Sequence, residues 1–197
     1  MREMLLVILV ASVLLVATWA QAFTPSVPPG LTGAPGEGTC ADCHYNLNVC
    51  SGGVTITAQT EYAAAETVDV VVEVHHQGQV KWGFELTALD DSDQPVGQFV
   101  IVDAERTQLD TDGGNGRQYV MHTAAGTDTG VPHSSLGWLF QWVAPAGRPP
   151  VTFYTSAVAA NNGSGTNGDF VYTATLSSTQ TGLDAETTWS RVKGQFR

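Results

Sequence analysis

The sequence has few basic residues, few charges of any kind and few cysteines. Eight Lys and Arg stand against 19 Asp and Glu, so the formal net charge of the 197 residues is −11. Binding to a phosphate backbone needs clustered Lys and Arg, so we expect no nucleic-acid partner. Charged residues make up 14% of the chain and hydrophobic residues 43%, which is not the composition of a disordered acidic tail.

Long apolar runs are scarce, and the one that is present lies at the start of the chain. Arg2 precedes an apolar run over residues 4–17, and Ala20-Gln21-Ala22 provides the small-x-small pattern of a cleavage site. These features predict a secretory signal peptide over residues 1–22. The run is too short for a convincing membrane span, and no later segment is apolar enough for one. We therefore expect an exported protein, located in the periplasm, at the cell surface or outside the cell.

Helical patterns are also scarce, and period-two alternation recurs from Val54 onward. Gly-, Asn- and Asp-rich linkers separate the alternating segments, and no helical run of about 10–15 residues lies between them. This pattern predicts an all-β fold, an antiparallel immunoglobulin-like β-sandwich of about eight strands. The expected strands are residues 54–59, 68–76, 82–89, 99–102, 117–123, 138–144, 150–159 and 169–176.

The chain divides into four parts. They are a signal peptide (1–22), a Pro- and Gly-rich arm (23–52), a sandwich (53–178) and a C-terminal tail (179–197). Residues 23–38 should be extended or turn-like and contribute little to the core. In the tail, Trp189, Val192 and Phe196 follow helical spacing, which predicts a short C-terminal helix that closes a sheet edge or docks on a partner.

Alternation within the expected strands indicates which side chains form the core. Trp138, Phe140 and Trp142 share one face of their strand, and we expect core packing rather than a ligand platform. The acidic linkers around Asp90 and Asp110 lack the spacing and closing Glu of a helix-loop-helix calcium loop. They are expected to be solvated turns.

The arm contains the pattern C-x-x-C-H at Cys40, Cys43 and His44. In c-type haem attachment, two thiols add across the two porphyrin vinyl groups and the adjacent imidazole reaches the iron. The motif predicts Cys40 and Cys43 as attachment residues for haem c, with His44 as the proximal ligand. Two alternatives stay open: a disulfide between Cys43 and either Cys40 or Cys50, or a zinc site made of the three cysteines and one His.

A bound haem would leave a sixth iron position to be filled. The candidates are Met121, His122, His75, His76 and His133. We prefer His122 as the distal ligand because its neighbourhood in the sequence is polar and Gly-flanked, which allows close approach. A Met ligand would raise the reduction potential relative to two histidines.

Six blocks, taken in order, resemble the reelin-type domain of bacterial exported proteins, the group called choice-of-anchor V. The blocks are TGAPGEGTCADCH (32–44), GGVTI (52–56), WGFEL (82–86), GRQYVMHT (116–123), WLFQWVAP (138–145) and AANNGSGTNGDFVY (159–172). Such domains are immunoglobulin-like sandwiches of the kind that begin the matrix protein reelin, and they also occur in ferric-chelate reductase-like proteins. The resemblance implies a binding or display domain, and in the bacterial group the C-x-x-C-H arm suggests haem.

Two functions are therefore expected. The first is an exported monohaem c-type protein for electron transfer or redox sensing, whose acidic surface selects a redox partner protein. The second is a non-enzymatic surface or matrix module with structural cysteines that binds an extracellular or cell-surface ligand, with zinc or no cofactor. No nucleophile elbow, H-E-x-x-H or phosphate loop is present, so the sequence assigns no catalytic residue and leaves enzyme activity open.

Overall fold

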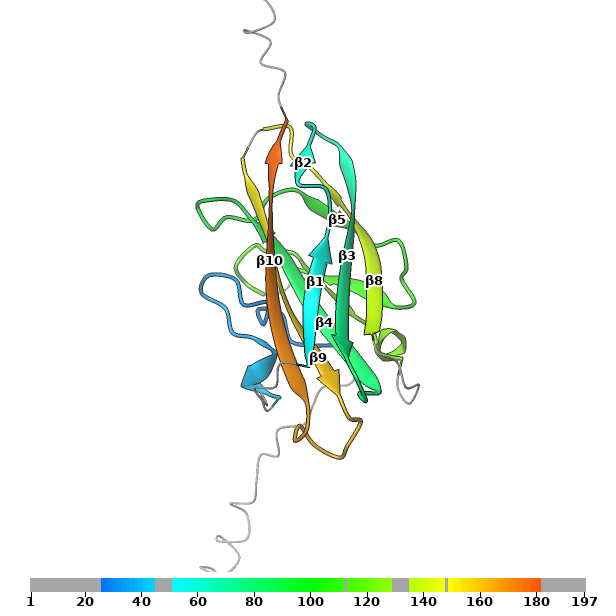
Figure 1. Ribbon diagram of the computed structural model, residues 1–197. Helices are drawn as coiled ribbons and strands as arrows, with labels where there is room; N and C mark the ends of the chain where they lie inside the picture. The colour runs from blue at the N-terminus through cyan, green and yellow to red at the C-terminus, as the bar shows by residue number, and fades with distance from the viewer. Residues whose placement is uncertain (1–25, 45–50, 112, 129–134, 148, 182–197) are drawn as a thin grey trace, which may run out of the picture.

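Two β-sheets pack face to face in the computed structural model of this chain (Figure 1). The structure describes residues 26–44, 51–111, 113–128, 135–147 and 149–181. The strands are β1 (Gly52–Thr57), β2 (Glu61–Tyr62), β3 (Thr67–His76), β4 (Lys81–Leu89), β5 (Gln98–Val100), β6 (Thr107–Asp110), β7 (Tyr119–His122), β8 (Ser135–Val143), β9 (Val151–Ala160) and β10 (Phe170–Gln180). Two 3-10 turns, η1 (Cys40–Asp42) and η2 (Ala125–Thr127), complete the elements. The fold is an all-β, immunoglobulin-like sandwich. Within the described ranges no helix is both long and apolar enough to cross a membrane.

The strand order is β1-β3-β8-β5 in one sheet and β2-β10-β9-β4-β7-β6 in the other. Antiparallel pairing is nearly complete; strand β4, for example, pairs with β9 from Lys81 opposite Ala160 to Leu89 opposite Thr152. The exception is the short strand β2, which lies parallel to the end of β10. Apart from this pair, the expectation of an antiparallel sandwich is confirmed.

All eight expected strands are present, with ends that differ from the expected ones by a few residues. Strand β10 runs to Gln180, so the sandwich extends slightly beyond the expected boundary at residue 178. Strands β2 and β6 were not expected, because two and four residues are too few to show alternation. The expected signal peptide and C-terminal helix lie outside the described residues.

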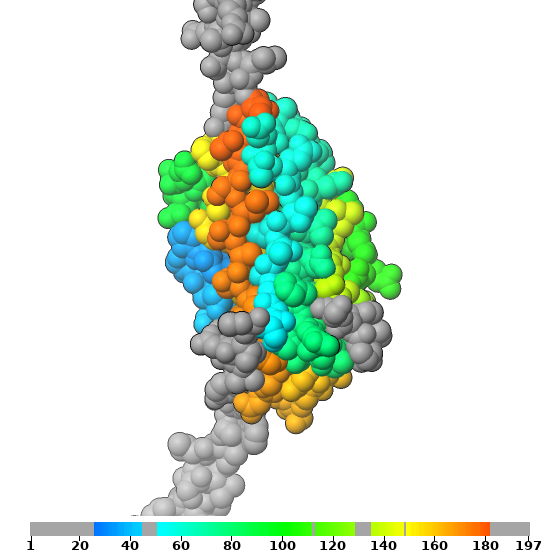
Figure 2. Space-filling view, in the orientation of Figure 1, coloured from blue at the N-terminus to red at the C-terminus, as the bar shows by residue number. Residues whose placement is uncertain are grey.

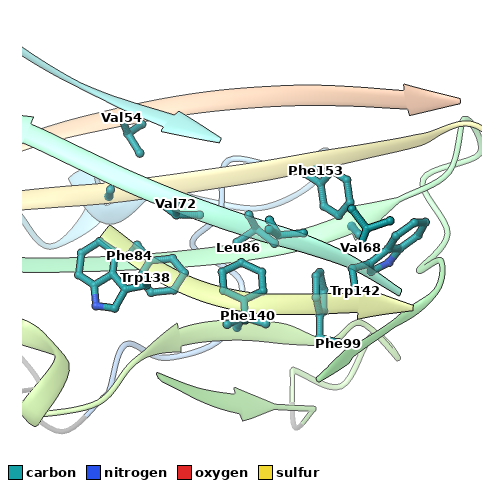
Figure 3. Packing of buried hydrophobic residues seen from close by; sticks show 14 of the residues in the cluster. Val54, Val68, Val72, Phe84, Leu86, Phe99, Trp138, Phe140, Trp142 and Phe153 are labelled. Atoms are coloured by element: carbon teal, nitrogen blue, oxygen red, sulfur yellow. The ribbon is translucent and has the colours of Figure 1, made fainter. Parts of the chain in front are cut away.

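The core fills the space between the sheets (Figure 3). Trp138, Phe140 and Trp142 are 1%, 0% and 1% exposed, which confirms their expected place in the core. The ring of Trp138 stacks on Phe84 with centroids 4.5 Å apart, and Trp142 meets the ring of Phe153 edge-on at 5.4 Å. Full burial of such side chains stabilises the fold by about 1.5–3 kcal/mol each.

The N-terminal arm lies on the outer face of the six-stranded sheet, away from this core, and Figure 2 shows it in blue beside the orange strand β10. Residues 30–38 form a compact turn, in which the backbone N–H of Gly33 donates to Gly38 at 2.8 Å. The expected irregular conformation is thus present, and the arm adds nothing to the main core cluster. It is nevertheless well packed, since Thr32 and Ala34 are 1% and 2% exposed.

Candidate functional site

The surface beneath the arm is the outer face of strands β4, β7, β9 and β10. Phe84 and Leu86 point into the core, so Glu85 between them points outward beneath the arm, in register with Ser156 of β9 and Met121 of β7. Glu85 is 0% exposed because the arm covers it. The alternating pattern of β4 predicts that this outer face is exposed to solvent. The arm covers it, so the residues between the arm and the sheet form a second buried layer.

Glu85 anchors the start of the arm. Its carboxylate accepts the backbone N–H of Gly30 at 3.2 Å and that of Leu31 at 2.6 Å. Burial raises the pKa of Glu85 to about 8, and the two backbone hydrogen bonds, which favour the charged form, offset only part of that rise. The attachment of the arm is therefore coupled to the protonation of one buried carboxyl.

Glu37 provides a second anchor. Arg117 forms an ion pair with the Glu37 carboxylate, and the hydroxyl of Tyr119 donates to the same Oε1 atom at 2.7 Å. Arg117 also donates to the carbonyl of Pro35 at 3.1 Å. The side chains of Arg117 and Glu37 are only 11% and 4% exposed, so this is a mostly desolvated pair. Together with Glu85 it fixes the arm on the sheet.

The C-x-x-C-H motif forms the 3-10 turn η1 and the two residues after it. Thr39 caps the turn, because its Oγ1 accepts the backbone N–H of Ala41 at 3.2 Å. The backbone N–H groups of Cys43 and His44 both donate to the carbonyl of Cys40, at 3.3 and 2.9 Å. The backbones of the three motif residues therefore share one short turn, in which Cys40 is buried and Cys43 is exposed.

Cys40 is the buried thiol of the motif. Its backbone N–H donates to Oγ of Ser156 at 3.0 Å, and its side chain, 5% exposed, packs in a small cluster with Val158, Ala160 and Val171. Burial raises the pKa of the Cys40 thiol to about 12, so the thiol stays protonated at neutral pH. Cys43 is exposed, and neither of these two cysteines is in a disulfide. Cys50 lies outside the described residues.

His44 is held from one side only. Its Nδ1 atom lies 2.6 Å from Oδ2 of Asp169, which is 2% exposed, whereas the imidazole itself is 21% exposed. Nε2 of His44 has no hydrogen-bond partner within the described ranges. An imidazole with one nitrogen on a carboxylate and the other bare has the arrangement typical of metal-ligating histidines.

His122, the preferred distal ligand, reaches the same outer face of the sheet. A Cβ on Gly83 would point outward and lie 2.7 Å from Cε1 of His122, so the imidazole rests directly on that glycine. Nδ1 of His122 lies 3.1 Å from both the backbone N and O of Phe84. Burial lowers the pKa of His122, the backbone hydrogen bond with Phe84 opposes this shift, and the proximity of Lys81 and His44 adds to it. The shift favours the neutral form of the ring.

The surroundings of His122 differ from those expected. Its side chain is buried, 9% exposed, and the glycine against its ring is Gly83 of strand β4 instead of a glycine that flanks it in the sequence. Because Gly83 is in register with Val158, which packs on Cys40, the structure places His122 close to the motif on one sheet face.

The other candidates for a sixth ligand lie in different settings. His75 lies in strand β3 of the opposite sheet. His76 has both ring nitrogens engaged, Nε2 with the hydroxyl of Ser51 at 3.1 Å and Nδ1 with a backbone carbonyl at 3.0 Å. Met121 shares the outer face beneath the arm but is 0% exposed. His133 lies outside the described residues.

Acidic and metal-binding side chains form no further site in the part of the chain that the structure describes. No group of three or more His, Cys, Asp and Glu side chains there could hold a metal ion. Asp90 accepts the backbone N–H groups of Ser92 and Gln94 at 2.8 and 3.0 Å, so its carboxylate serves an exposed turn. The zinc alternative depends on Cys50, which is not described.

Comparisons with known proteins add information on the fold only. No protein-family model matches the chain, and no curated protein matches it. Among solved structures, the chain is similar to a cohesin module from a Clostridium perfringens family 33 glycoside hydrolase, with 8% identity, a TM-score of 0.47 and coverage of 67% of this chain and 98% of that one. A non-cellulosomal cohesin from Archaeoglobus fulgidus gives 10% identity, a TM-score of 0.35 and coverage of 69% and 96%.

Two residues of the site were not expected from the sequence. Asp169 ends a Gly- and Asn-rich linker whose composition predicts a turn. The one feature that could have marked it as a site residue is its position in the last block of the family resemblance. Glu85 lies in the WGFEL block, where alternation assigns it to the solvent side of its strand. The hydrogen-bond partners of Glu85 and Asp169 could not be predicted from the local sequence pattern, because those partners are far away in the sequence.

Proposed function

We propose that this chain is an exported monohaem c-type protein that carries its haem on the C-x-x-C-H turn and takes part in electron transfer or redox sensing. The observation that carries the proposal is the state of His44: Nδ1 is engaged by Asp169, and Nε2 is without a partner among the described residues. The presence of the motif behind an expected signal peptide agrees with it, because export places the thiols where haem attachment occurs.

The types and spacing of the motif residues are those of a covalent haem attachment site. Cys40 and Cys43 are three positions apart on one turn and form no disulfide among the described residues; His44 follows directly, and its Nε2 has no partner in the same part of the chain. When bound, the haem supplies one-electron redox chemistry, with a potential set by its axial ligands and surroundings. The chain itself provides two thiols, an imidazole that meets a carboxylate at Nδ1, and a second, buried imidazole at His122.

One condition follows from the burial of Cys40. Its thiol packs against Val158, Ala160 and Val171, and the raised thiol pKa leaves little thiolate to react. A porphyrin cannot reach that sulfur while the arm is docked as described. Haem attachment therefore requires the turn that carries Cys40 to leave this docked position, and the haem-bearing turn cannot return to it with Cys40 packed on the sheet.

The net negative charge of the protein indicates the kind of redox partner it would bind. With a formal net charge of −11, the protein presents an acidic field that attracts a redox partner with a basic docking face. Screening by salt would weaken this attraction, so electron exchange with such a partner would slow as ionic strength rises. The proposed location of this exchange is the periplasm, the cell surface or the extracellular space.

The proposal is tested by producing the full chain in a bacterial host that has haem-attachment machinery. We expect a Soret absorption band that remains with the protein after acid-acetone extraction. The Cys43→Ser variant should lose most of this covalently held colour, whereas Cys50→Ser, a matched change outside the motif, should keep it. Colourless wild-type protein from that host would refute haem attachment.

A second candidate function is favoured by the burial of Cys40. In a non-enzymatic surface or matrix module, Cys40 would simply be a small apolar residue that packs the arm onto the sheet, without any cofactor. Under this reading the Cys40→Ala variant keeps whatever binding the sandwich performs. It should also melt within a few degrees of the wild type, and the wild-type protein should carry no haem.

A further inference from the structure

Ser51 and His76 form a polar pair away from the arm, at the end of the sandwich where strand β1 begins and strand β3 ends. The Oγ atom of Ser51 lies 3.1 Å from Nε2 of His76, and Nδ1 of His76 lies 3.0 Å from the backbone carbonyl oxygen of Gln77. A carbonyl oxygen can only accept, so in the neutral ring the proton is on Nδ1, and Nε2 accepts the hydroxyl of Ser51. This is the polarity with which an imidazole activates a serine for nucleophilic attack.

The imidazole of His76 is held in place by aromatic packing. His76 is 6% exposed, and its ring stacks on Phe170 with the centroids 3.9 Å apart and the planes inclined by 17°. Phe170 is the first residue of strand β10, which lies beside β1 (Figure 1). A ring that is already packed in this position needs no further ordering at the moment of reaction, so His76 is a preorganised base for residue 51.

The start of strand β1 fixes the backbone of Ser51 next to this base. Gly52, the residue that follows Ser51, pairs with His76 in the β1–β3 ladder. A Cβ at Gly52 would collide with the hydroxyl of Tyr172 and with the carbonyl oxygen of His75, so the strand fits closely between its neighbours here. Ser51 itself is exposed. A molecule in solution can therefore reach a hydroxyl whose other side is already engaged by an imidazole.

We propose that Ser51 is a nucleophile activated by His76, and that it takes acyl groups from activated, uncharged esters. This activity goes beyond the proposed function and does not depend on haem. Oγ of Ser51 bonds to the carbonyl carbon of the ester while its proton passes to Nε2 of His76; the bond to the alcohol oxygen then breaks, and the alcohol leaves with that proton. Water attacks the acyl-Ser51 ester by the same route, which releases a carboxylic acid and restores the serine.

Two features define the class of substrate. The group that orients His76 is a backbone carbonyl, which fixes the tautomer but carries no charge, so it stabilises the imidazolium less than a carboxylate would. Esters with good leaving groups, such as aryl esters, are therefore expected to react, and alkyl esters much more slowly. The formal net charge of −11 repels anions, which favours an uncharged acyl group.

The first test treats the full chain, produced without haem, with an alkyl fluorophosphonate and locates the label by proteolysis and mass spectrometry. The serine oxygen bonds to phosphorus and fluoride leaves, so the label marks activated serines. We expect Ser51 to be labelled at least about 100-fold faster than Ser177, the gain typical of a positioned base. Ser177 is the matched control because it is exposed and its hydroxyl lies 3.1 Å from the hydroxyl of Thr152 instead of an imidazole. His76→Gln should reduce the labelling of Ser51 to the rate of Ser177.

The second test measures p-nitrophenol release from p-nitrophenyl acetate by the same protein. We expect a burst of one p-nitrophenol per chain, lost in Ser51→Ala and kept in Ser177→Ala and Cys43→Ser. The exposed position of Ser51 makes its alanine variant safe for folding, which a thermal melt confirms, whereas His76 is buried. Labelling of Ser51 no faster than that of Ser177, or a burst that survives in Ser51→Ala, would overturn the proposal. A burst lost only in Cys43→Ser would assign the reaction to the thiol and overturn it equally.

Discussion

The two faces of the six-stranded sheet bury very different side chains. The inner face packs apolar residues such as Phe84, Leu86 and Phe153 against the other sheet, and each is at most 1% exposed. The outer face, beneath the arm, buries Glu85 and Asp169 to 0% and 2% exposure. Apolar burial stabilises a fold without any special geometry, whereas a buried carboxylate costs stability unless hydrogen bonds compensate for it.

The apolar inner face forms the scaffold of the domain, and the outer face with its buried carboxylates forms the candidate site. The buried carboxylates of Glu85 and Asp169 both have partners in the arm: Gly30 and Leu31 for Glu85, and His44 for Asp169. The core would form without these contacts, because its cluster contains no residue of the arm. We therefore expect changes in the core to unfold the whole domain, and changes beneath the arm to release the arm from a folded sandwich.

The largest effect is expected from truncation in the core. Phe140 is 0% exposed and packs its ring against Phe84 and Phe99. Phe140→Ala should lower the free energy of unfolding by about 4 kcal/mol, because it removes apolar contacts and leaves a cavity. Denaturant unfolding followed by tryptophan fluorescence measures this loss. The control is Leu139→Ala, one residue earlier and 45% exposed, which should change stability by less than about 0.5 kcal/mol.

The second effect is a pH dependence caused by Glu85. Its pKa rises from 4.5 to about 8 on folding, so the folded state binds this proton more tightly than the unfolded state. The associated stability is complete below about pH 4.5 and is lost as pH rises through about 8. At about 1.4 kcal/mol per pH unit, the loss is on the order of a few kcal/mol.

The Glu85→Gln variant tests this dependence. Its unfolding free energy should vary less between pH 4.5 and 8 than that of the wild type, and the difference between the two profiles isolates residue 85. Glu73→Gln, at an exposed position of strand β3, should leave the wild-type profile unchanged. Identical profiles for the wild type and Glu85→Gln would mean that the arm does not bury this carboxyl.

The third effect concerns the second anchor of the arm. Arg117→Ala leaves Glu37 mostly buried without its ion-pair partner, and we expect a loss of about 2 kcal/mol, less than for a fully buried pair. The matched change Arg106→Ala breaks a pair whose partners are 30% and 32% exposed, and it should cost less than about 1 kcal/mol. Equal losses in thermal melts of the two variants would contradict the buried docking of the arm.

The smallest effect is expected at the Cys40 turn. Ser156→Ala removes the acceptor for the backbone N–H of Cys40, at a cost of about 1 kcal/mol. Hydrogen exchange should become faster at the Cys40 amide and stay unchanged at core amides such as that of Phe140. Ser177→Ala, at an exposed position of strand β10, serves as the control. Faster exchange throughout the sandwich would mean that arm and core unfold as one unit.

The sandwich could be predicted from the sequence because its strands are long enough to alternate. Every second residue of strand β3 is buried over its ten positions, and on β8 the buried Trp138, Phe140 and Trp142 alternate with less buried residues. Strand β2 has two residues and carries no such pattern, so it could not be found. Its place in the sheet depends on pairing with β10, a contact between distant parts of the chain.

The site could be predicted only in part. The motif identifies Cys40, Cys43 and His44, since its spacing alone indicates the chemistry. The docking of the arm could not be predicted, because a Pro- and Gly-rich segment shows no apolar face and its contacts are backbone N–H groups on a distant carboxylate. Asp169 was missed for the same reason: it is 125 residues away from the histidine that it contacts.

The measurement that tests the central claim most directly is the intact mass of the purified full chain, produced in a host with haem-attachment machinery. The account predicts a mass increased by one haem, carried by the fragment that contains Cys40–His44 after proteolysis. A mass lower by two hydrogens, with no haem on that fragment, would show a disulfide in its place and contradict the account.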